Sequence, residues 1–346
     1  MSLMQVMRIF GPNLWGWVAD QSRRRVLVLR LTSVAAALSF CGMFVGQTFV
    51  FFFALMVMVN LFTSAQGPIS EALMLSSMRG DLTHYGRLRL WGSVGFIVVV
   101  TLSGYVLDWQ GIQLMPWIAL LMLVMVTSVT FSMNEEPVPH HSQDSSSVRQ
   151  LLARKSILSF FVSTFLMIAA HSSLYVYYSL YLSEIGYSKA VIGLMWSLGV
   201  IAEILFFFYQ APLFRRFGVR QLMLFSLAIG LVRFLMIAWG AESLWILLLA
   251  QVLHAATFGV HHSASVVTLQ RWFAGPLQAR GQALYISISY GLGGTLGGLL
   301  LSACWDTLGA RPVYLIAALM SLLGLLAARS EEHTSELQSR ETISYA

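Results

Sequence analysis

Charged side chains are scarce in this sequence, because Asp, Glu, Lys and Arg together make up only 10% of its 346 residues. A soluble globular domain carries about 25% of such residues. Hydrophobic residues make up 57% of the chain, which is more apolar surface than a water-exposed protein of this size hides in its core. The shortage of charge therefore argues against a soluble protein and indicates that most side chains face lipid.

Lysine and cysteine are almost missing as well, with two residues of each. The net charge of +6 comes from arginines in short clusters between apolar segments, unlike the continuous basic patch of a nucleic-acid-binding protein. Cys41 and Cys304 lie in different apolar segments, where a cysteine behaves as a small buried hydrophobe. We therefore expect no nucleic-acid partner, no disulfide framework and no metal site.

Apolar segments are abundant, and each is about long enough to cross a hydrocarbon core of roughly 30 Å. They predict an all-α, polytopic membrane protein with about eleven transmembrane helices. The approximate ranges of the predicted helices are 1–18, 27–46, 49–76, 89–108, 112–133, 157–182, 189–211, 222–240, 243–270, 281–303 and 311–328.

A polar stretch between the fifth and sixth predicted helices divides the chain. It contains two prolines, three consecutive serines and the pair His140-His141, which favours a flexible, solvated loop over a metal site. The predicted domains are an N-terminal helical half at residues 1–133, a cytoplasmic linker at 134–155 and a C-terminal helical half at 156–328.

The last residues, 329–346, differ in composition from the rest of the chain. They are polar, include four glutamates and lack the apolar period of a membrane helix. The segment resembles a translated sequencing adapter, so we interpret it as a non-native tail and leave it out of the predicted fold.

A weak internal repeat relates the two halves with an offset of 195 residues, which places Gly86 on Gly281. In this register Met1 falls on Trp196, although the second half begins near Ser156. We therefore expect about forty residues, including a first helix, to be missing before Met1. An intact chain would have two halves of six helices, related by an axis along the membrane normal, as in many transporters.

Arginine-containing loops alternate with loops that carry little charge, and this alternation predicts the orientation of the chain. The basic loops lie near residues 23–25, 79–87, 149–155, 215–220 and 271–280. Because cytoplasmic loops carry an excess of basic residues, we assign these loops and the central linker to the cytoplasm.

One basic loop resembles a motif of the major facilitator superfamily. Gly16 and Asp20 precede three consecutive arginines, and the usual pattern between helices two and three of these transporters is Gly-x-x-x-Asp-Arg-x-Gly-Arg-Arg. Positions 21 and 23 depart from that pattern. The resemblance implies a cytoplasmic gating motif formed by Gly16, Asp20, Arg24 and Arg25.

Three further stretches, at residues 85–93, 196–203 and 251–262, are similar to the phenylpropionic acid permease branch of that superfamily, which is related to the lactose permease group. This resemblance extends to about residue 328. It implies the major facilitator fold of two six-helix halves, here without the first helix. It also implies uptake of an aromatic carboxylic acid together with a proton.

Ionisable residues are expected at the centres of three helices in the second half. A charge at the bilayer centre costs several kcal/mol, so Glu203, Arg233 and His254 are functional candidates. Their order resembles the acid, arginine and histidine that couple proton and substrate in lactose permease. We predict that Glu203 carries the coupled proton, that Arg233 is its partner or anchors a substrate carboxylate, and that His254 binds a proton or the substrate. The alternative is a static ion pair that only fixes helix packing.

Several other polar residues are predicted to contact substrate. Arg8 occupies the place of Glu203 in the repeat and is suited to an anionic substrate, unless it extends to the membrane surface. Asn60 and Glu71 have the spacing of residues on one face of a helix, and Gln66 lies near that face. We include Asn60 and Gln66 in the site and interpret Glu71 as a partner of nearby arginines.

Aromatic residues and glycines complete the set of candidates. His171, Tyr175 and Tyr178 recur at helical spacing and predict an aromatic wall for an aromatic or sugar-like ligand, the alternative being an aromatic belt at the membrane interface. His261 is a further candidate substrate ligand. Small-xxx-small spacing, which predicts close helix packing, is found at Gly291, Gly293, Gly294, Gly297 and Gly298.

The expected function is proton-coupled uptake of a small organic solute by alternating access, with no cofactor. The resemblance suggests phenylpropionate or a related acid. The first alternative is a sugar, nucleoside or drug transporter of the same superfamily. A membrane-embedded enzyme is the alternative from another class, but the sequence has no HExxH or GxSxG motif. We expect a monomer in the lipid of a bacterial inner membrane whose partners are its substrate and protons.

Overall fold

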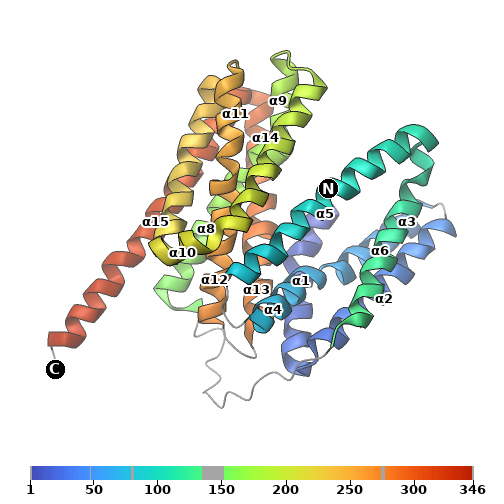
Figure 1. Ribbon diagram of the computed structural model, residues 1–346, viewed down its shortest axis with the longest axis horizontal. Helices are drawn as coiled ribbons and strands as arrows, with labels where there is room; N and C mark the ends of the chain where they lie inside the picture. The colour runs from blue at the N-terminus through green and yellow to red at the C-terminus, as the bar shows by residue number, and fades with distance from the viewer. Residues whose placement is uncertain (1, 47, 79–81, 135–151, 274–276, 345–346) are drawn as a thin grey trace. The chain divides into compact units, whose positions relative to one another are not determined.

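The computed structural model describes residues 2–344 apart from 47, 79–81, 135–151 and 274–276 (Figure 1). Every regular element in this described part is helical, so the predicted all-α fold is confirmed. Eight described segments are long and apolar enough to cross a membrane. The eleven predicted ranges all fall on helical backbone to within a few residues. A long apolar segment in lipid has to pair its own N–H and C=O groups, and a helix does so within the segment.

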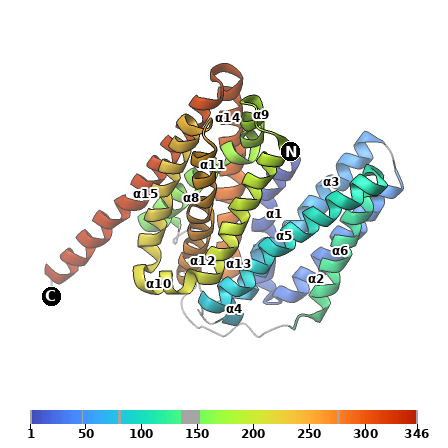
Figure 2. The same ribbon diagram turned by 45° about the horizontal axis from the view of Figure 1, so that its top comes forward.

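The described helices pack into two compact units, and the first unit comprises Met1–His141 together with Leu269–Ser287. Within it α2 lies beside α3 and α6 (Figures 1 and 2), and α13 packs against α1 and α4. Its helices are α1 (Ser2–Ser22), α2 (Arg25–Cys41), η1 (Gly42–Phe44), α3 (Phe49–Thr63), α4 (Gln66–Met78), α5 (Leu82–Gln110), η2 (Ile112–Leu114), α6 (Met115–Ser132) and α13 (Gln278–Tyr285).

The second unit comprises Ser142–Thr268 and Ile288–Ala346, and its core forms where α8, α10, α14 and α15 pack together. The helix α12 ends just inside the first unit, and η6 spans the boundary. The remaining helices are α8 (Lys155–Ser173), η3 (Leu174–Tyr178), α9 (Ser179–Glu184), α10 (Lys189–Gly240), α11 (Leu244–Val252), η4 (Ala255–Val260), α12 (His261–Trp272), η6 (Ile286–Gly293), α14 (Gly294–Leu308) and α15 (Ala310–Ser344).

Two predicted membrane helices are joined within α10. Gly218 has φ 71° and ψ 162°, which interrupts the helix between the predicted ranges 189–211 and 222–240. Glycine reaches positive φ without the steric penalty of a side chain, so the chain reverses there. The two parts of α10 can therefore each present a face to α11 and η4.

Three described segments are π-helical, namely η3, η4 and η6. Such segments insert an extra residue into the helical turn and often occur at functional sites. They interrupt the regular spacing on which the sequence predictions relied. The segments η3 and η4 flank the polar residues of the second unit.

The glycine run predicted to allow close helix packing lies against α8. A Cβ atom on Gly297 would lie 2.5 Å from Cα of Ala169, and one on Gly293 would lie 2.8 Å from the carbonyl oxygen of Phe165. Side chains at these two positions would clash with α8, so close packing is confirmed for Gly293 and Gly297. A Cβ atom on Gly298 would meet no described atom within 4 Å.

The helix α15 continues past its apolar part, Ala310–Arg329, and ends at Ser344. The polar tail is therefore helical, although its sequence lacks the apolar period that would predict a helix. The glutamates, leucine and glutamine of this segment have high intrinsic helix propensity, which does not require an apolar face. The non-native origin of the tail stays a prediction.

Candidate functional site

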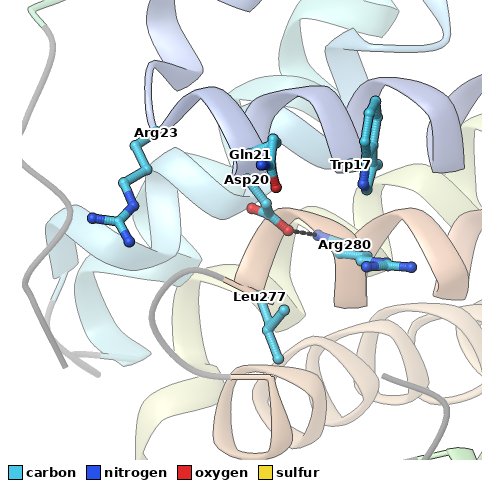
Figure 3. A pocket seen from close by; sticks show the side chains of 6 residues that line it. All are labelled: Trp17, Asp20, Gln21, Arg23, Leu277 and Arg280. Atoms are coloured by element: carbon cyan, nitrogen blue, oxygen red, sulfur yellow. Dashed lines mark hydrogen bonds between the residues drawn. The ribbon is translucent and has the colours of Figure 1, made fainter. Parts of the chain in front are cut away.

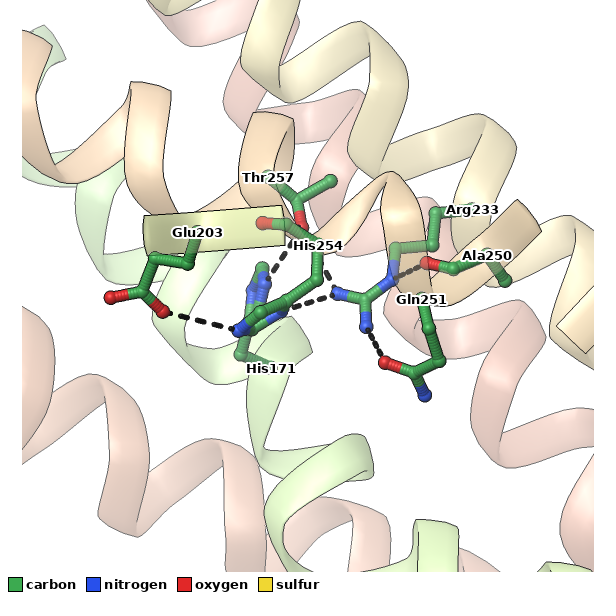
Figure 4. A network of polar contacts seen from close by, with 7 residues as sticks. All are labelled: His171, Glu203, Arg233, Ala250, Gln251, His254 and Thr257. Carbon is green, nitrogen blue, oxygen red and sulfur yellow. Dashed lines mark hydrogen bonds and ion pairs between the residues drawn. The ribbon is translucent and has the colours of Figure 1, made fainter. Parts of the chain in front are cut away.

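Three elements of the second unit place their polar side chains in one buried cluster (Figure 4). The first part of α10 carries Glu203, and the second part carries Arg233. The segment from α11 to η4 contributes Gln251, His254 and Thr257. All five side chains are buried, with exposed fractions of 8% or less. The three residues predicted to couple protons thus lie together.

His254 connects the two parts of α10. Its Nδ1 lies 3.1 Å from NH1 of Arg233, and its Nε2 lies 3.7 Å from Oε2 of Glu203. A guanidinium only donates hydrogen bonds, so Nδ1 must accept and the neutral ring carries its proton on Nε2. That proton points toward the carboxylate, which makes His254 a bridge between Arg233 and Glu203.

Arg233 has acceptors for each of its nitrogens. Nε donates to the carbonyl oxygen of Ala250 at 2.7 Å, NH1 donates to Oγ1 of Thr257 at 3.0 Å, and NH2 approaches Oε1 of Gln251 at 3.3 Å. A buried charge is tolerated when its donors are satisfied in this way. The guanidinium is therefore fixed in one orientation by α11 and η4.

Thr257 extends the network to α8. Nδ1 of His171 lies 2.8 Å from the carbonyl oxygen of Met167, so this nitrogen must donate. Nε2 of the neutral ring is then an acceptor, and it lies 3.3 Å from Oγ1 of Thr257. His171 was predicted as part of a substrate-binding wall, and the structure joins it to the same buried network as Arg233.

The predicted aromatic wall is divided by the π-helical segment η3. Tyr178 and His171 are fully buried, whereas Tyr175 is 51% exposed. Trp196 on α10, which was not predicted as a site residue, packs against both tyrosines. Its ring is stacked on Tyr175 with centroids 6.4 Å apart and meets Tyr178 edge-on at 5.6 Å. Tyr175 and Trp196 thus offer ring surface beside the polar cluster.

His261 lies in the same unit as this cluster, but its contact is with Ser226. Nδ1 of the ring is 3.0 Å from the hydroxyl oxygen, and both side chains are buried. The role predicted for His261 was a substrate ligand. Its exposed fraction of 2% places the ring inside the helix packing.

Other predicted substrate residues lie in the first unit. Asn60 donates to the carbonyl oxygen of Met56 at 2.8 Å, within its own helix. The helix that was expected to carry both Asn60 and Glu71 is interrupted, because α3 ends at Thr63 and a new helix, α4, begins at Gln66. Their common face stays a prediction. Glu71 accepts a hydrogen bond from Tyr85 at 2.9 Å and also interacts electrostatically with Arg89, one of its expected arginine partners. Arg8 lies in α1, and its side chain is outside the described part of the chain.

The predicted gating motif lies where α1 meets the start of α13 (Figure 3). Oδ2 of Asp20 accepts the backbone N–H of Arg280 at 2.9 Å, and Oδ1 is 3.6 Å from NH2 of Arg25. The first N–H groups of a helix have no partner in the helix and favour a negative charge, so Asp20 caps α13. Arg25 also donates to Gln278 at 3.3 Å.

The close approach of α1 and α13 requires Gly16. A Cβ atom there would lie 2.7 Å from Cβ of Ala283 and 3.1 Å from the carbonyl oxygen of Ala279. Arg24 stands at the start of α2, where its N–H approaches the hydroxyl of Ser22. A neighbouring pocket of about 230 Å³ is lined by Trp17, Asp20, Gln21, Arg23, Leu277 and Arg280.

Burial raises the pKa of Asp20 from 3.8 to about 7, although Arg25 and the N–H of Arg280 lower it. The desolvation penalty therefore exceeds the attraction of its partners. The carboxyl group changes charge near neutral pH, at a point where two helices are joined.

The sequence matches the family model described as the MFS_1 like family over residues 1–316. The chain belongs to the MFS_1-like family. This MFS_1-like transporter is 26% identical over 292 residues to the probable 3-phenylpropionic acid transporter of Escherichia coli K12, across 83% of this chain and 76% of that protein. It is also 28% identical over 332 residues to the maltose permease of Geobacillus stearothermophilus, across 94% and 83%.

The fold of the MFS_1-like chain is also similar to that of the Escherichia coli fucose:proton symporter FucP, with a TM-score of 0.72 and 15% identity. That match covers 94% of this chain and 89% of FucP. The predicted major facilitator family and its all-α multi-pass fold are thus confirmed. The protein is a membrane transporter of small molecules, and the relatives named here are transporters rather than enzymes.

Proposed function

We propose that this MFS_1-like transporter imports a small organic solute together with a proton, by alternating access, as a monomer in a bacterial inner membrane. The observation that carries this proposal is the bridge from Arg233 through His254 to Glu203. It places a buried carboxyl group where a change of protonation alters a network shared by three helical segments.

The coupling step follows from the hydrogen-bond directions. When Glu203 is ionised, its carboxylate attracts the Nε2–H of His254. Protonation removes that charge and weakens the contact, which gives the cluster two arrangements of different energy. A transporter needs such a two-state element if binding of a proton is to favour one conformation.

Arg233 acts in this proposal as the partner of the carboxyl group through His254. Its donors are directed at Ala250, Gln251, His254 and Thr257. A substrate carboxylate would have to displace one of these contacts. We therefore propose Arg8, rather than Arg233, as the anchor of an anionic substrate.

The substrate class that we propose is an aromatic carboxylic acid such as phenylpropionate. The stacked rings of Tyr175 and Trp196 support it, because a flat apolar ring gains from offset stacking on such a surface. The similar Escherichia coli protein is named a probable transporter of 3-phenylpropionic acid, which is an aromatic carboxylic acid. Asn60, Gln66 and His171 stay proposed contributors to substrate binding.

Reconstitution in proteoliposomes tests this function. We expect an inward proton gradient to drive accumulation of an aromatic acid, with maltose, fucose and a nucleoside as competitors. Glu203→Gln should abolish gradient-driven accumulation and retain exchange of labelled for unlabelled substrate. Glu184→Gln, at an exposed position at the end of α9, is the matched control and should behave as wild type. Unchanged accumulation by Glu203→Gln would refute the proposed coupling, and preference for a sugar or nucleoside would refute the substrate class.

A further inference from the structure

His261 is a buried histidine beyond the cluster of Glu203, Arg233 and His254. The second part of α10 presents Ser226 and Arg233 two helical turns apart on one face. Arg233 contacts His254, and Ser226 contacts His261, so the same two helical segments meet twice. His261 lies about 10 Å along the helix axis from His254.

The hydrogen-bond directions determine which nitrogen of His261 is basic. The hydroxyl of Ser226 donates its single proton to the carbonyl oxygen of Met223 at 2.7 Å. Its oxygen must therefore accept from Nδ1–H of His261, which lies 3.0 Å away. The neutral ring then has a lone pair at Nε2, and this atom has no hydrogen-bond partner among the described residues.

The surroundings of this nitrogen differ from those of the corresponding nitrogens of His254 and His171. Nε2 of His254 faces the carboxylate of Glu203, and Nε2 of His171 lies 3.3 Å from the hydroxyl oxygen of Thr257. Buried acceptors without a partner are rare in native proteins, and each calls for a ligand or a function. A histidine nitrogen with a free lone pair is a chemically competent proton acceptor when water reaches it.

The position of His261 is in line with movement of protons toward one membrane surface. The helix α12 runs from His261 to Trp272, at the start of the basic loop that the positive-inside rule assigns to the cytoplasm. Gln210 lies two turns beyond Glu203 on α10, and its buried amide also lacks a partner among the described residues. Phe206 packs against Gly259, so these two segments run alongside each other from Glu203 and His254 toward Gln210 and His261.

We propose that His261 is a second proton-acceptor site, through which protons pass between the Glu203–His254 pair and the cytoplasm. A proton leaves the carboxyl group of Glu203, which becomes a carboxylate, and is carried by water to Nε2 of His261. The new N–H bond makes the ring an imidazolium with both nitrogens protonated. Loss of that proton from Nε2 to cytoplasmic water restores the neutral ring. This step rests on the proposed proton coupling.

The charged groups around His261 decide how readily it takes up a proton. His171 on α8 is close enough to interact with it electrostatically, and Arg233 and His254 lie two turns away on the elements that pack together. His262 is its neighbour on α12. Arg233 disfavours an imidazolium at His261, whereas the carboxylate that Glu203 becomes after losing its proton favours it. The charge of His261 therefore depends on whether Glu203 has released its proton.

Transport measurements with His261→Gln separate a proton relay from a structural role. Glutamine can still donate to Ser226 but cannot carry a proton. We expect net uptake driven by a proton gradient to fall about a hundredfold, the lower end of the range for loss of an acid–base group, with substrate exchange within about twofold of wild type. The control is Thr268→Ala on the same helix, whose hydroxyl donates to the carbonyl oxygen of Ala264, and both rates should stay unchanged.

Three outcomes would overturn the relay or its premise. If uptake and exchange by His261→Gln fall together, the residue is structural or binds substrate; if neither falls, it has no role. Wild-type uptake that ignores the proton gradient would instead refute the proposed function. Nitrogen NMR of histidine-labelled protein, assigned with His261→Gln, then decides the proton site independently. We expect a proton on Nδ1 at high pH and on both nitrogens at lower pH, and a proton on Nε2 at high pH would refute it.

Discussion

The carboxylate of Asp20 at the end of α1 accepts the backbone N–H of Arg280 at 2.9 Å, although the two residues are 260 positions apart in the sequence. This contact joins the predicted gating motif to the first turn of α13. A helix from late in the chain thereby packs in the same compact unit as α1 and α4. The charge of the Asp20 carboxyl group, which lies between α1 and α13, therefore affects the free energy of unfolding.

Asp20→Asn should reveal that charge through the pH dependence of stability. Because the pKa of Asp20 is raised to about 7 in the folded protein, the folded state holds a proton that the unfolded state releases above about pH 4. The stability of the wild type should therefore fall, relative to Asp20→Asn, as pH rises from 5 to 8, by on the order of 2 kcal/mol.

Thermal unfolding in detergent at several pH values measures this difference. The melting temperature of wild type minus that of Asp20→Asn is expected to decrease with rising pH. Arg23→Gln, an exposed position near the same pocket, is the control and should show a flat difference. An increase with pH would mean that the contacts with Arg25 and Arg280 outweigh desolvation, contrary to the described burial.

Gly16→Leu should separate α1 from α13. The Cβ atom of the added side chain would lie 2.7 Å from Cβ of Ala283 and 3.1 Å from the carbonyl oxygen of Ala279, a backbone atom that cannot move without shifting α13. Such overpacking costs about 1–3 kcal/mol. We expect a lower melting temperature and slower transport, whereas Gly193→Leu should change neither, since a Cβ atom on Gly193 meets no described atom within 4 Å.

Thr257→Val should impair the cluster while keeping its shape. Valine removes the oxygen that accepts from NH1 of Arg233, and loss of a hydrogen bond to a buried charged group costs about 1.5–3 kcal/mol. We expect net uptake to fall about tenfold or more. Thr257→Ser retains the hydroxyl and should retain most activity, and equal rates for the two variants would show that the hydroxyl is not needed.

Trp196→Ala should weaken binding of aromatic substrates. The variant loses the ring that stacks on Tyr175 and with it part of the aromatic surface proposed to bind the substrate ring. An aromatic pair is worth about 0.5–1.5 kcal/mol, which corresponds to a rise in KM of up to about tenfold. Kinetics with an aromatic acid and with an aliphatic acid of similar length measure the effect. The control is Trp245→Ala, because this ring is 79% exposed. An equal rise in KM for both acids would argue against ring stacking.

Much of the helical fold followed from hydropathy alone, because each span needs a long apolar run that water does not reach. The break between α3 and α4 did not, because Ser64 and Ala65 interrupt the helix without a glycine or proline at the break itself. The sequence placed Gly218 between two predicted spans. It could not show that helical backbone would continue on both sides of Gly218, with this one residue at positive φ.

The site was predictable in its charges and less so in its contacts. Burial cost identified Glu203, Arg233 and His254. It could not show that His254 would stand between the other two, nor that Gln251 and Thr257 would satisfy the guanidinium. The contact of Thr257 is made from the π-helical segment η4, whose changed residue spacing leaves no clear mark in the hydrophobic pattern. The spacing of His254 and Thr257, three residues apart, is the signal that could have suggested a shared face.

The two tyrosines near η3 illustrate the same limit. Tyr175 and Tyr178 have helical spacing, which predicted a common wall with His171. The π-helical segment instead leaves Tyr175 half exposed and buries Tyr178. Trp196 is distant in the sequence, so its stacking on Tyr175 depends on how α10 packs beside η3.

Proton movement during substrate uptake tests the central claim most directly. Proteoliposomes are prepared with equal pH on both sides and little buffer outside, and the external pH is recorded when an aromatic acid is added. We predict that wild type takes up protons and makes the medium more alkaline, and that Glu203→Gln gives no such signal although it still exchanges substrate. Substrate uptake without alkalinisation by wild type, or the same alkalinisation by Glu203→Gln, would contradict coupling through Glu203 and His254.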